Sequence, residues 1–347
     1  MKRYLVLTAL CLMALVSSAN GYRGDDDRYK YEEKKIVEKN FDVNADPILE
    51  MNGKYSDFII TAWDNQQIDF KVTILVKSNN NDKLKAKINS IDIGFNKIGN
   101  KVIAETVFGE YPYNTFNGSI TIKYYVNVPK DVFMELDTKY GDIMVDTVYK
   151  RFEVDIKYGD LMADNLLDIS SIDIKYGNIN INNAKNIDLE LDYGDAKITK
   201  CDHIKGALKY SKIFITELGE GKLENKYSDA RIEKADIIDF DDNAYSDLKV
   251  RNITNRLDAD IRYTDLSATV TSLSPIIDID GQYSDMVLYI NENAAFDYSL
   301  KSSYGDIVFK GFFDAKTIAN HGTYGSGELG RIDITTRYGD VDIIKNK

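Results

Sequence analysis

The stretch that decides the fold is "VDIKYGDLMADNLLDISSIDIKYGN" (residues 154–178), in which Tyr-Gly followed by an acid or an amide occurs twice, 18 residues apart. Similar triplets of tyrosine, a small residue and a polar residue occur at Tyr55, Tyr140, Tyr158, Tyr176, Tyr193, Tyr210, Tyr227, Tyr245, Tyr263, Tyr283, Tyr304 and Tyr338. From Tyr140 to Tyr304 the spacings are 18, 18, 17, 17, 17, 18, 18, 20 and 21 residues. A fixed period indicates a repeat architecture. The triplets are either ligands in a repeated binding site or corners in a repeated backbone.

Apolar residues keep a fixed phase relative to each tyrosine. Phe152, Val154 and Ile156 occupy alternate positions before Tyr158, and the alternation changes parity after the acid, at Leu161. Alternation places such residues on one face of a strand, and a change of parity indicates a sharp corner between two strands. Glycine suits a corner because it tolerates unusual backbone angles, and Asp or Asn because their side chains bond neighbouring backbone N–H groups. Each repeat is therefore predicted to be strand, corner, strand and polar turn.

Two architectures fit this repeat. In a β-solenoid each repeat is one coil and equivalent strands stack in parallel, whereas in an antiparallel meander each corner is a two-residue hairpin. A meander would need more than about 20 strands, and open twisted sheets rarely exceed about 10. A membrane barrel needs strands of about 9–11 residues, longer than those after the corner. The sequence therefore predicts an all-β fold, a right-handed β-helix-like β-solenoid with coils of about 17–21 residues.

The start of the chain carries an export signal. Residues 1–19 contain Lys2 and Arg3, an apolar run from Tyr4 to Val16, and three small residues, which is typical of a cleaved signal peptide. The apolar run is shorter than the about 20 residues of a membrane span, and no later segment is apolar for longer. We expect an exported, soluble protein of the periplasm, the outer-membrane surface or the extracellular space, with no transmembrane segment in the mature chain.

Three further regions are predicted. Residues 20–35 are charged and aperiodic, so they are expected to be a solvated leader. In residues 36–130 the alternating "IDFKVTILV" predicts a strand, a short amphipathic helix is expected to start at Asn81 or Asp82, and a hairpin is expected to turn at Gly99-Asn100. We expect 36–130 to begin the solenoid, with the helix and hairpin as a cap or insertion. Residues 131–347 are predicted to form one continuous solenoid.

Composition excludes several classes of partner and cofactor. Removal of the signal peptide changes the net charge from −12 to −14, and such an acidic chain argues against binding to nucleic acid or anionic lipid. It also removes Cys11, so Cys201 is the only thiol; we interpret it as a buried apolar residue, with a nucleophile as the alternative. His203 and His321 are too few for a zinc site. We predict no catalytic, metal-binding or cofactor-binding residue, and no cofactor.

We assign the repeated residues to architecture. The tyrosines share the parity of the apolar positions, so they are predicted to be a stacked ladder at the core edge; the alternative is an exposed strip that binds sugar rings. The acids are predicted to cap backbone N–H groups locally; the alternative is a calcium ladder, although the Gly-Gly-x-Gly-x-Asp motif is absent. The structural repeat residues are Tyr55, Tyr140, Gly141, Asp142, Tyr158, Gly159, Asp160, Tyr176, Gly177, Tyr193, Gly194, Asp195, Tyr227, Asp229, Tyr245, Asp247, Tyr263, Asp265, Tyr283, Asp285, Tyr304, Gly305, Asp306, Tyr338, Gly339 and Asp340.

Two blocks carry a resemblance to a known family. They are "NFDVNADPILEMNGKYSDFIITAWDNQQIDFKVTILVKSNN" (residues 40–80) and "LDTKYGDIMVD" (residues 136–146). The chain from about residue 36 to 347 resembles a bacterial adhesin family, a secreted β-strand-repeat domain of unknown function related to the head GIN-domain proteins. The resemblance implies a β-solenoid exported from a Gram-negative type of cell, and it brings no catalytic residues.

Three functions are compatible with this sequence. The first is an exported, non-catalytic adhesin-like or envelope interaction protein that binds a protein or glycan along the side of the solenoid. The second is a polysaccharide-active β-helix enzyme, which would need a unique acid pair or an Asp/Glu/Arg groove on one coil. The third is a structural envelope scaffold. Because Asp recurs on nearly every repeat and Arg is scattered, we favour the first function and expect no enzyme.

Overall fold

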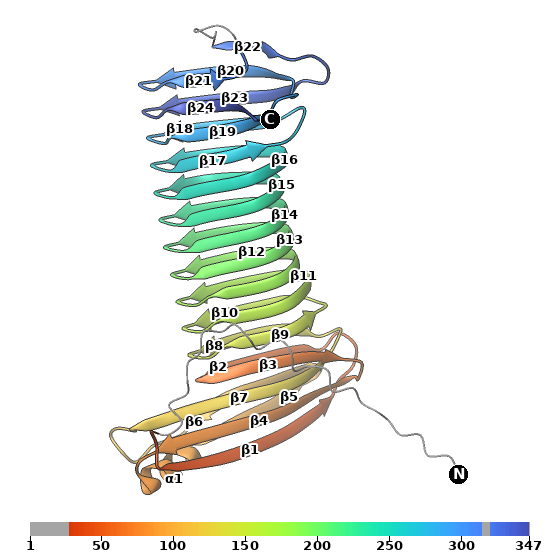
Figure 1. Cartoon of the computed structure of the whole chain (residues 1–347). Helices are drawn as coiled ribbons and strands as arrows, with labels where there is room; N and C mark the ends of the chain where they lie inside the picture. Colours follow the sequence, from red (N-terminus) through yellow and green to blue (C-terminus); the bar gives the residue numbers. More distant parts are fainter. Residues whose placement is uncertain (1–27, 314–319, 347) are drawn as a thin grey trace, which may run out of the picture.

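The computed structural model of the protein describes residues 28–313 and 320–346. These residues form a long stack of β-coils that is broader at its N-terminal end, where helix α1 (Asn81–Asn89) lies (Figure 1). The predicted signal peptide, residues 1–19, lies outside the described residues. The predicted β-solenoid is confirmed: equivalent strands of successive coils pair in parallel and in register, for example Val154 with Ile172 and Ile172 with Leu189.

Each coil contributes a strand to each of two walls. Strands of the first wall lead into a repeat tyrosine: β2 (Ile48–Lys54), β8 (Phe133–Lys139), β10 (Phe152–Lys157), β18 (Ile276–Gln282), β20 (Phe296–Ser303) and β23 (Gly330–Arg337). Strands of the second wall follow the corner: β3 (Ser56–Trp63), β9 (Ile143–Val148), β17 (Asp265–Val270), β19 (Met286–Asn291), β21 (Ile307–Lys310) and β24 (Val341–Asn346). Six long strands run from the second wall into the first: β11 (Leu161–Lys175), β12 (Ile179–Asp192), β13 (Asp195–Lys209), β14 (Lys212–Lys226), β15 (Asp229–Ala244) and β16 (Asp247–Arg262).

The core lies between the two walls. In one coil Phe152, Val154 and Ile156 of the first wall and Leu161 and Ala163 of the second wall are buried, while the residues between them face solvent. Because strands have a side-chain period of two, the alternation noted in the sequence directs one apolar row per wall inward. Stacking the coils joins these rows into one continuous core.

The N-terminal end is built from strands that are not in chain order. In one layer β4 (Gln67–Ser78) pairs antiparallel with β1 (Tyr31–Asp42) and β7 (Gly118–Pro129), and β7 pairs in parallel with β3. In the other layer β5 (Ile91–Ile98) and β6 (Lys101–Phe108) form a hairpin, and β6 pairs with β2. The β2–β3 coil therefore lies between these strands and the coil of β8 and β9, although residues 64–132 separate it from that coil in sequence.

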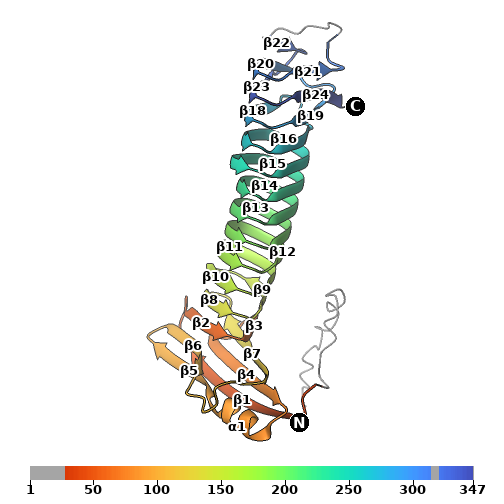
Figure 2. The same cartoon turned by 90° about the vertical axis from the view of Figure 1, so that its left-hand side faces the viewer.

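The helix begins where the sequence predicts it, whereas the first strand begins earlier than expected. Helix α1 (Asn81–Asn89) is capped by Asn80, whose side chain accepts a hydrogen bond from the Lys83 amide. The helix lies at the wide end of the molecule (Figure 2), and its Leu84 and Ile88 are buried. Strand β1 begins at Tyr31, inside the predicted leader, because twelve residues pair with β4. The first residues of this strand are charged and mostly exposed, and their composition therefore indicated a solvated leader.

The C-terminal coils also stack out of chain order. We call residues 276–291 the inner coil, residues 296–310 the outer coil and residues 330–346 the inserted coil. The inserted coil lies between the other two: β23 pairs with both β18 and β20, and β24 with both β19 and β21. Beyond the outer coil, β22 (His321–Tyr324) pairs antiparallel with β20. At this end of the molecule consecutive repeats therefore do not stack consecutively.

Candidate functional site

The tyrosine itself turns the corner of each coil. All twelve repeat tyrosines have positive φ, between 50° and 62°, in the left-handed region that non-glycine residues rarely adopt. The glycines that follow, such as Gly159 and Gly177, are not among the residues with positive φ. The expectation that glycine supplies the unusual backbone angle is therefore wrong, since the angle belongs to the residue before it.

Glycine is required by the close approach of neighbouring coils. A Cβ atom on Gly177 would lie 1.8 Å from the carbonyl oxygen of Gly159, and one on Gly159 would lie 2.0 Å from the carbonyl oxygen of Gly141. These contacts are far shorter than van der Waals separation, so any side chain would force the coils apart. The glycines therefore allow the close backbone packing of neighbouring coils.

Where the small residue is Ser or Thr, a hydroxyl group replaces the glycine contact. The Ser211 hydroxyl donates to the Lys209 carbonyl oxygen over 2.8 Å, and the Ser211 amide donates to the hydroxyl of Ser228 over 3.0 Å. The same arrangement continues through Ser246, Thr264 and Ser284. All five of these residues except Ser246 are almost fully buried. Sequence reasoning treated Gly, Ser and Thr as equivalent and missed this change of chemistry.

The corner acids bond to the neighbouring coil rather than to their own turn. The Asp160 amide donates to Asp142 Oδ1 over 2.9 Å, the Asn178 amide to Asp160 Oδ1 over 2.7 Å, and the Asp195 amide to Asn178 Oδ1 over 3.1 Å. Burial raises the pKa of Asp142, while the bond from the Asp160 amide opposes the shift. The predicted local capping is thus replaced by capping between coils.

The tyrosine rings form one stacked ladder along the edge of the molecule. Neighbouring ring centroids are 4.8–5.2 Å apart and the ring planes lie within 14° of parallel. The rings are 39–52% exposed, except Tyr304 at the end of the ladder, which is 77% exposed. The predicted stacking is present, but the rings lie outside the core because positive φ turns them outward. The two neighbours of an inner ring cover both of its faces, so the ladder offers ring edges and hydroxyl groups rather than ring faces.

A row of basic residues runs beside the ladder. The residue before the tyrosine is basic in eight of the twelve repeats: Lys54, Lys139, Lys157, Lys175, Lys209, Lys226, Arg262 and Arg337. The ammonium groups of Lys54, Lys139 and Lys157 lie 5.1–5.8 Å from the centroid of the adjacent ring, which is cation–π range. We call this row and the ladder together the tyrosine edge.

Part of this basic row has no carboxylate partner. Lys175, Lys226 and Arg262 form ion pairs with nearby aspartates. In the described part of the chain, no carboxylate lies within ion-pair distance of Lys54, Lys139, Lys157, Lys209 or Arg337. A protein with 56 acidic and 44 basic side chains therefore keeps unpaired cations at one position of the coil. Sequence reasoning missed this row, although its signal, a basic residue directly before the tyrosine, recurs in eight of the twelve repeats.

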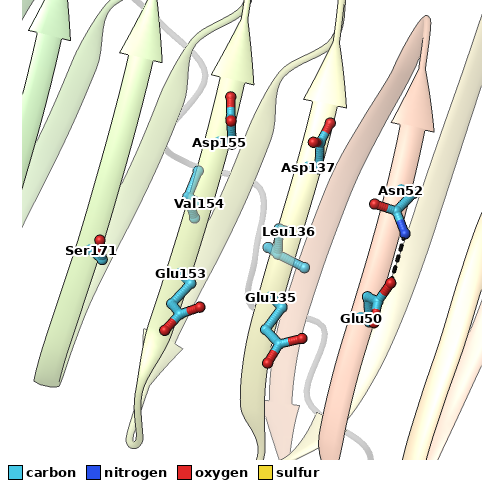
Figure 3. A pocket seen from close by; sticks show the side chains of 9 residues that line it. All are labelled: Glu50, Asn52, Glu135, Leu136, Asp137, Glu153, Val154, Asp155 and Ser171. Atoms are coloured by element: carbon cyan, nitrogen blue, oxygen red, sulfur yellow. Dashed lines mark hydrogen bonds between the residues drawn. The ribbon is translucent and has the colours of Figure 1, made fainter.

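The outer face of the first wall is acidic near the N-terminal end. An open depression of about 400 Å³ is lined mainly by Glu50, Asn52, Glu135, Asp137, Glu153, Asp155 and Ser171, and these side chains lie in two rows across four strands (Figure 3). Lys101 bridges Glu50 and Glu135 at 2.6 and 2.9 Å. Burial raises the pKa of Asp137, and the neighbouring Asp155 adds to the shift. Among the described residues no three His, Cys, Asp or Glu side chains converge as a metal site would require.

A second depression places arginines beside aspartates near the C-terminal end. It is lined by Arg256, Asp258, Ile276, Asp278, Leu329, Gly330 and Arg331. Arg256 pairs with Asp258 at 2.6 Å, and Arg331 pairs with Asp278 at 3.4 Å. Both depressions are broad and open. The aspartates of the second depression form ion pairs with arginines of the same or a neighbouring strand, so we interpret them as ion pairs on the surface of the sheet.

Cys201 lies in the core and not at a surface site. It is 1% exposed, and burial raises the pKa of its thiol to about 12. A thiol with that pKa is almost entirely protonated at neutral pH and is a poor nucleophile. Within residues 28–313 and 320–346 the structure has no helix long and apolar enough to cross a membrane.

The fold and the repeated edge define a β-solenoid repeat protein. The chain belongs to the Toastrack family DUF4097, which matches residues 171–344. No curated protein matches the chain in sequence.

Solved structures similar to this chain include two described as a "putative adhesin". The one from Parabacteroides distasonis has 12% identity and a TM-score of 0.42, with 73% of this chain and 96% of that chain covered. The one from Bacteroides fragilis has 10% identity and a TM-score of 0.30, with 90% and 97% covered. A "putative lipid binding protein" from Parabacteroides distasonis has 9% identity and a TM-score of 0.36, with 90% and 97% covered.

Proposed function

We propose that the protein is an exported, non-catalytic, adhesin-like interaction protein that binds an extended acidic glycan of the cell envelope or surface along the tyrosine edge. The observation that carries this proposal is the row of unpaired basic side chains beside the tyrosine ladder. Unpaired cations in an otherwise acidic protein are a surface on which an anionic chain gains electrostatic attraction. Export depends on the predicted signal peptide at residues 1–19.

The mode of binding follows from the ladder. Because the inner rings cover one another's faces, sugar rings cannot lie flat on them, and the phenol hydroxyl groups and lysine ammonium groups are the available donors. A polymer that follows the stack meets a phenol hydroxyl group at every coil, about 4.8 Å apart, and a basic side chain at eight of the twelve repeats. Many weak contacts along one polymer raise the overall affinity without a deep pocket.

Neither alternative function has comparable support. An enzyme for polysaccharides would need one coil whose acids differ from those of its neighbours, and the acidic depression instead repeats the same residue types on successive strands. A structural scaffold needs the stack but leaves the unpaired basic row unexplained.

Affinity measurements with defined polymers test the proposal. Polygalacturonate, an acidic glycan, and uncharged dextran are titrated into the mature protein by isothermal calorimetry at low and high salt. We expect binding to polygalacturonate that weakens as salt rises, because salt screens exposed charges, and no binding to dextran. Replacement of Lys139, Lys157 and Lys209 by glutamine should reduce the affinity at least about tenfold, a loss of about 1.4 kcal/mol.

The matched control removes the same charge from another face. Lys197, Lys200 and Lys249 are exposed lysines of the second wall, and their replacement by glutamine should leave the affinity nearly unchanged. Equal losses in both triple variants would mean that only net charge matters. No binding of polygalacturonate at either salt concentration would overturn the choice of an acidic glycan as ligand.

A further inference from the structure

The inserted coil is held on both sides by the contacts that join ordinary neighbours. The Tyr338 ring lies 4.8 Å from both the Tyr283 ring and the Tyr304 ring. The Asp340 amide donates to Asp285 Oδ1 over 3.0 Å, and the Asp306 amide donates to Asp340 Oδ1 over 2.9 Å. The slot between the inner and outer coils is therefore complementary to a Tyr-Gly-Asp coil.

The two coils that form the slot also match each other. Ile277 of the inner coil and Tyr298 of the outer coil both pair with Ile332, and Ile279 and Leu300 both pair with Ile334. These inward-facing residues are buried or nearly so. If the inserted coil leaves, the outer coil can stack directly on the inner coil in the same register, as consecutive coils do elsewhere in the chain. Departure therefore does not leave two apolar surfaces exposed to water.

The segment that leads into the inserted coil has the properties of a hinge. Residues 325–329, Gly-Ser-Gly-Glu-Leu, connect β22 to β23, and Gly325 and Gly327 have φ of 79° and 114°. A Cβ atom on Gly327 would have no other atom within 4 Å, so this part of the hinge is open to solvent. Strand β22 pairs with β20 on the outer coil. A movement of the inserted coil away from the outer coil would therefore change the backbone angles of these five residues alone.

We propose that residues 330–346 are an exchangeable coil through which one copy of the protein binds a second copy. In the exchanged pair the inserted coil of each copy occupies the slot of the other, and every contact of the slot is kept. The partner is a second copy because the slot requires a strand–tyrosine–glycine–aspartate–strand unit in this register. The proposal is independent of the glycan proposed above, since it rests on the contacts of the slot and not on the unpaired charges of the tyrosine edge.

A disulfide across the slot reports which copy supplies the inserted coil. Asp280 and Thr335 are exposed register partners on adjacent strands, and adjacent strands lie about 4.8 Å apart, within the Cα separation that a disulfide needs. The variant D280C/T335C is unfolded in reductant, refolded at several protein concentrations, oxidised and separated on a non-reducing gel. Native Cys201 can stay because it is buried.

The expected result is a disulfide-linked dimer whose ratio to monomer increases about tenfold for a tenfold rise in protein concentration during refolding. The matched control is D173C/E190C, register partners in the uninterrupted stack, which should give only monomers with an internal disulfide. Removal of residues 326–328 should raise the dimer fraction of wild-type protein in size-exclusion chromatography, because a shorter hinge hinders return to the same copy. Internally linked D280C/T335C monomer alone, at every concentration, would overturn the proposal.

Discussion

The backbone amide of Asp160 donates a hydrogen bond of 2.9 Å to the carboxylate of Asp142, its counterpart one coil earlier. Asp142 in turn donates its amide to Asp57, so the carboxylates of Asp57 and Asp142 each accept from the coil that stacks on them. This relationship explains how these acids can recur at a spacing of one coil. Each of these carboxylates is partly neutralised by an N–H group, and bonds to charged groups are among the stronger hydrogen bonds in proteins.

Replacement of Asp160 by alanine removes an acceptor used by both the amide and the side chain of Asn178. Both bonds are exposed, so water can replace the lost acceptor, and we expect a loss of about 0.5–1.5 kcal/mol in the free energy of unfolding. Asp160→Asn, which keeps an acceptor oxygen, should lose less. Urea denaturation checks the order of the three proteins, and equal stability of the alanine and asparagine variants would contradict it.

Chelation separates this account from a calcium ladder. Because the corner acids bond to backbone amides, EDTA should leave the melting temperature of the wild-type protein unchanged. Thermal unfolding with and without chelator is the measurement. A fall in melting temperature that disappears in the variant D142N/D160N/D195N would make these acids calcium ligands.

Glycine 177 tests the packing of the coils. A Cβ atom there would lie 1.8 Å from the Gly159 carbonyl oxygen, so Gly177→Ala should destabilise the protein by about 1–3 kcal/mol or more through overpacking. Gly109→Ala is the control, since its Cβ atom would have only one neighbour, at 3.5 Å. Surface changes of this kind usually stay within about 0.5 kcal/mol. Similar denaturation midpoints for the two variants would be inconsistent with glycine as a packing requirement.

Tyrosine 193 separates ring stacking from backbone strain. Its ring stacks on Tyr176 and Tyr210, 4.9 and 5.0 Å away, and each aromatic pair contributes about 0.5–1.5 kcal/mol. Tyr193→Phe keeps both contacts and should be nearly as stable as wild type. Tyr193→Ala loses both contacts and keeps the positive φ, whereas Tyr193→Gly loses them but relieves strain of about 1–2 kcal/mol. The expected order of stability is Phe, Gly, Ala; an alanine variant more stable than the glycine variant would contradict it.

The raised pKa of Asp137 predicts how the effect of replacing it depends on pH. Burial first, and then the neighbouring Asp155, raise the pKa of Asp137. A raised pKa in the folded state means that ionised Asp137 disfavours folding, so its cost appears as pH rises through the ordinary aspartate range near about 4 and remains at neutral pH. Asp137→Asn should therefore raise the melting temperature at pH 7 and have little effect at pH 3. The opposite pattern would show that the carboxylate is stabilised by a partner.

The sequence was sufficient for the architecture because the period and the parity are set by local rules. A row such as Phe152, Val154 and Ile156 can only face one side of a strand, and a period of 17–21 residues selects stacked coils over hairpins. The corner was harder to predict. Tyrosine and glycine are adjacent in six of the twelve repeats, as at Tyr158 and Gly159, so composition cannot reveal which of the two adopts positive φ and which is limited by contact with the next coil.

The order of the coils was beyond sequence reasoning for a different reason. The repeats at Tyr304 and Tyr338 carry the same Tyr-Gly-Asp motif, so either fits beside Tyr283. At the N-terminal end the unpatterned distance between Tyr55 and Tyr140 gave no sign that β6 and β7 return to the outer side of the first coil. At both ends the order of the coils is determined by where a long connection places the next strand. That placement is decided by tertiary packing and not by the local sequence pattern.

The central claim is that the tyrosine repeat is the corner of parallel, stacked coils. In this arrangement Asp173 neighbours Glu190 of the next coil, whereas Asn180 lies on the opposite wall, beyond the corner at Tyr176. In an antiparallel meander the corner at Tyr176 would instead place Asp173 opposite a residue near Asn180. The most direct measurement is disulfide formation in D173C/E190C compared with D173C/N180C under the same mild oxidation. The account predicts a nearly complete internal disulfide in the first variant and almost none in the second, and the reverse result would contradict it.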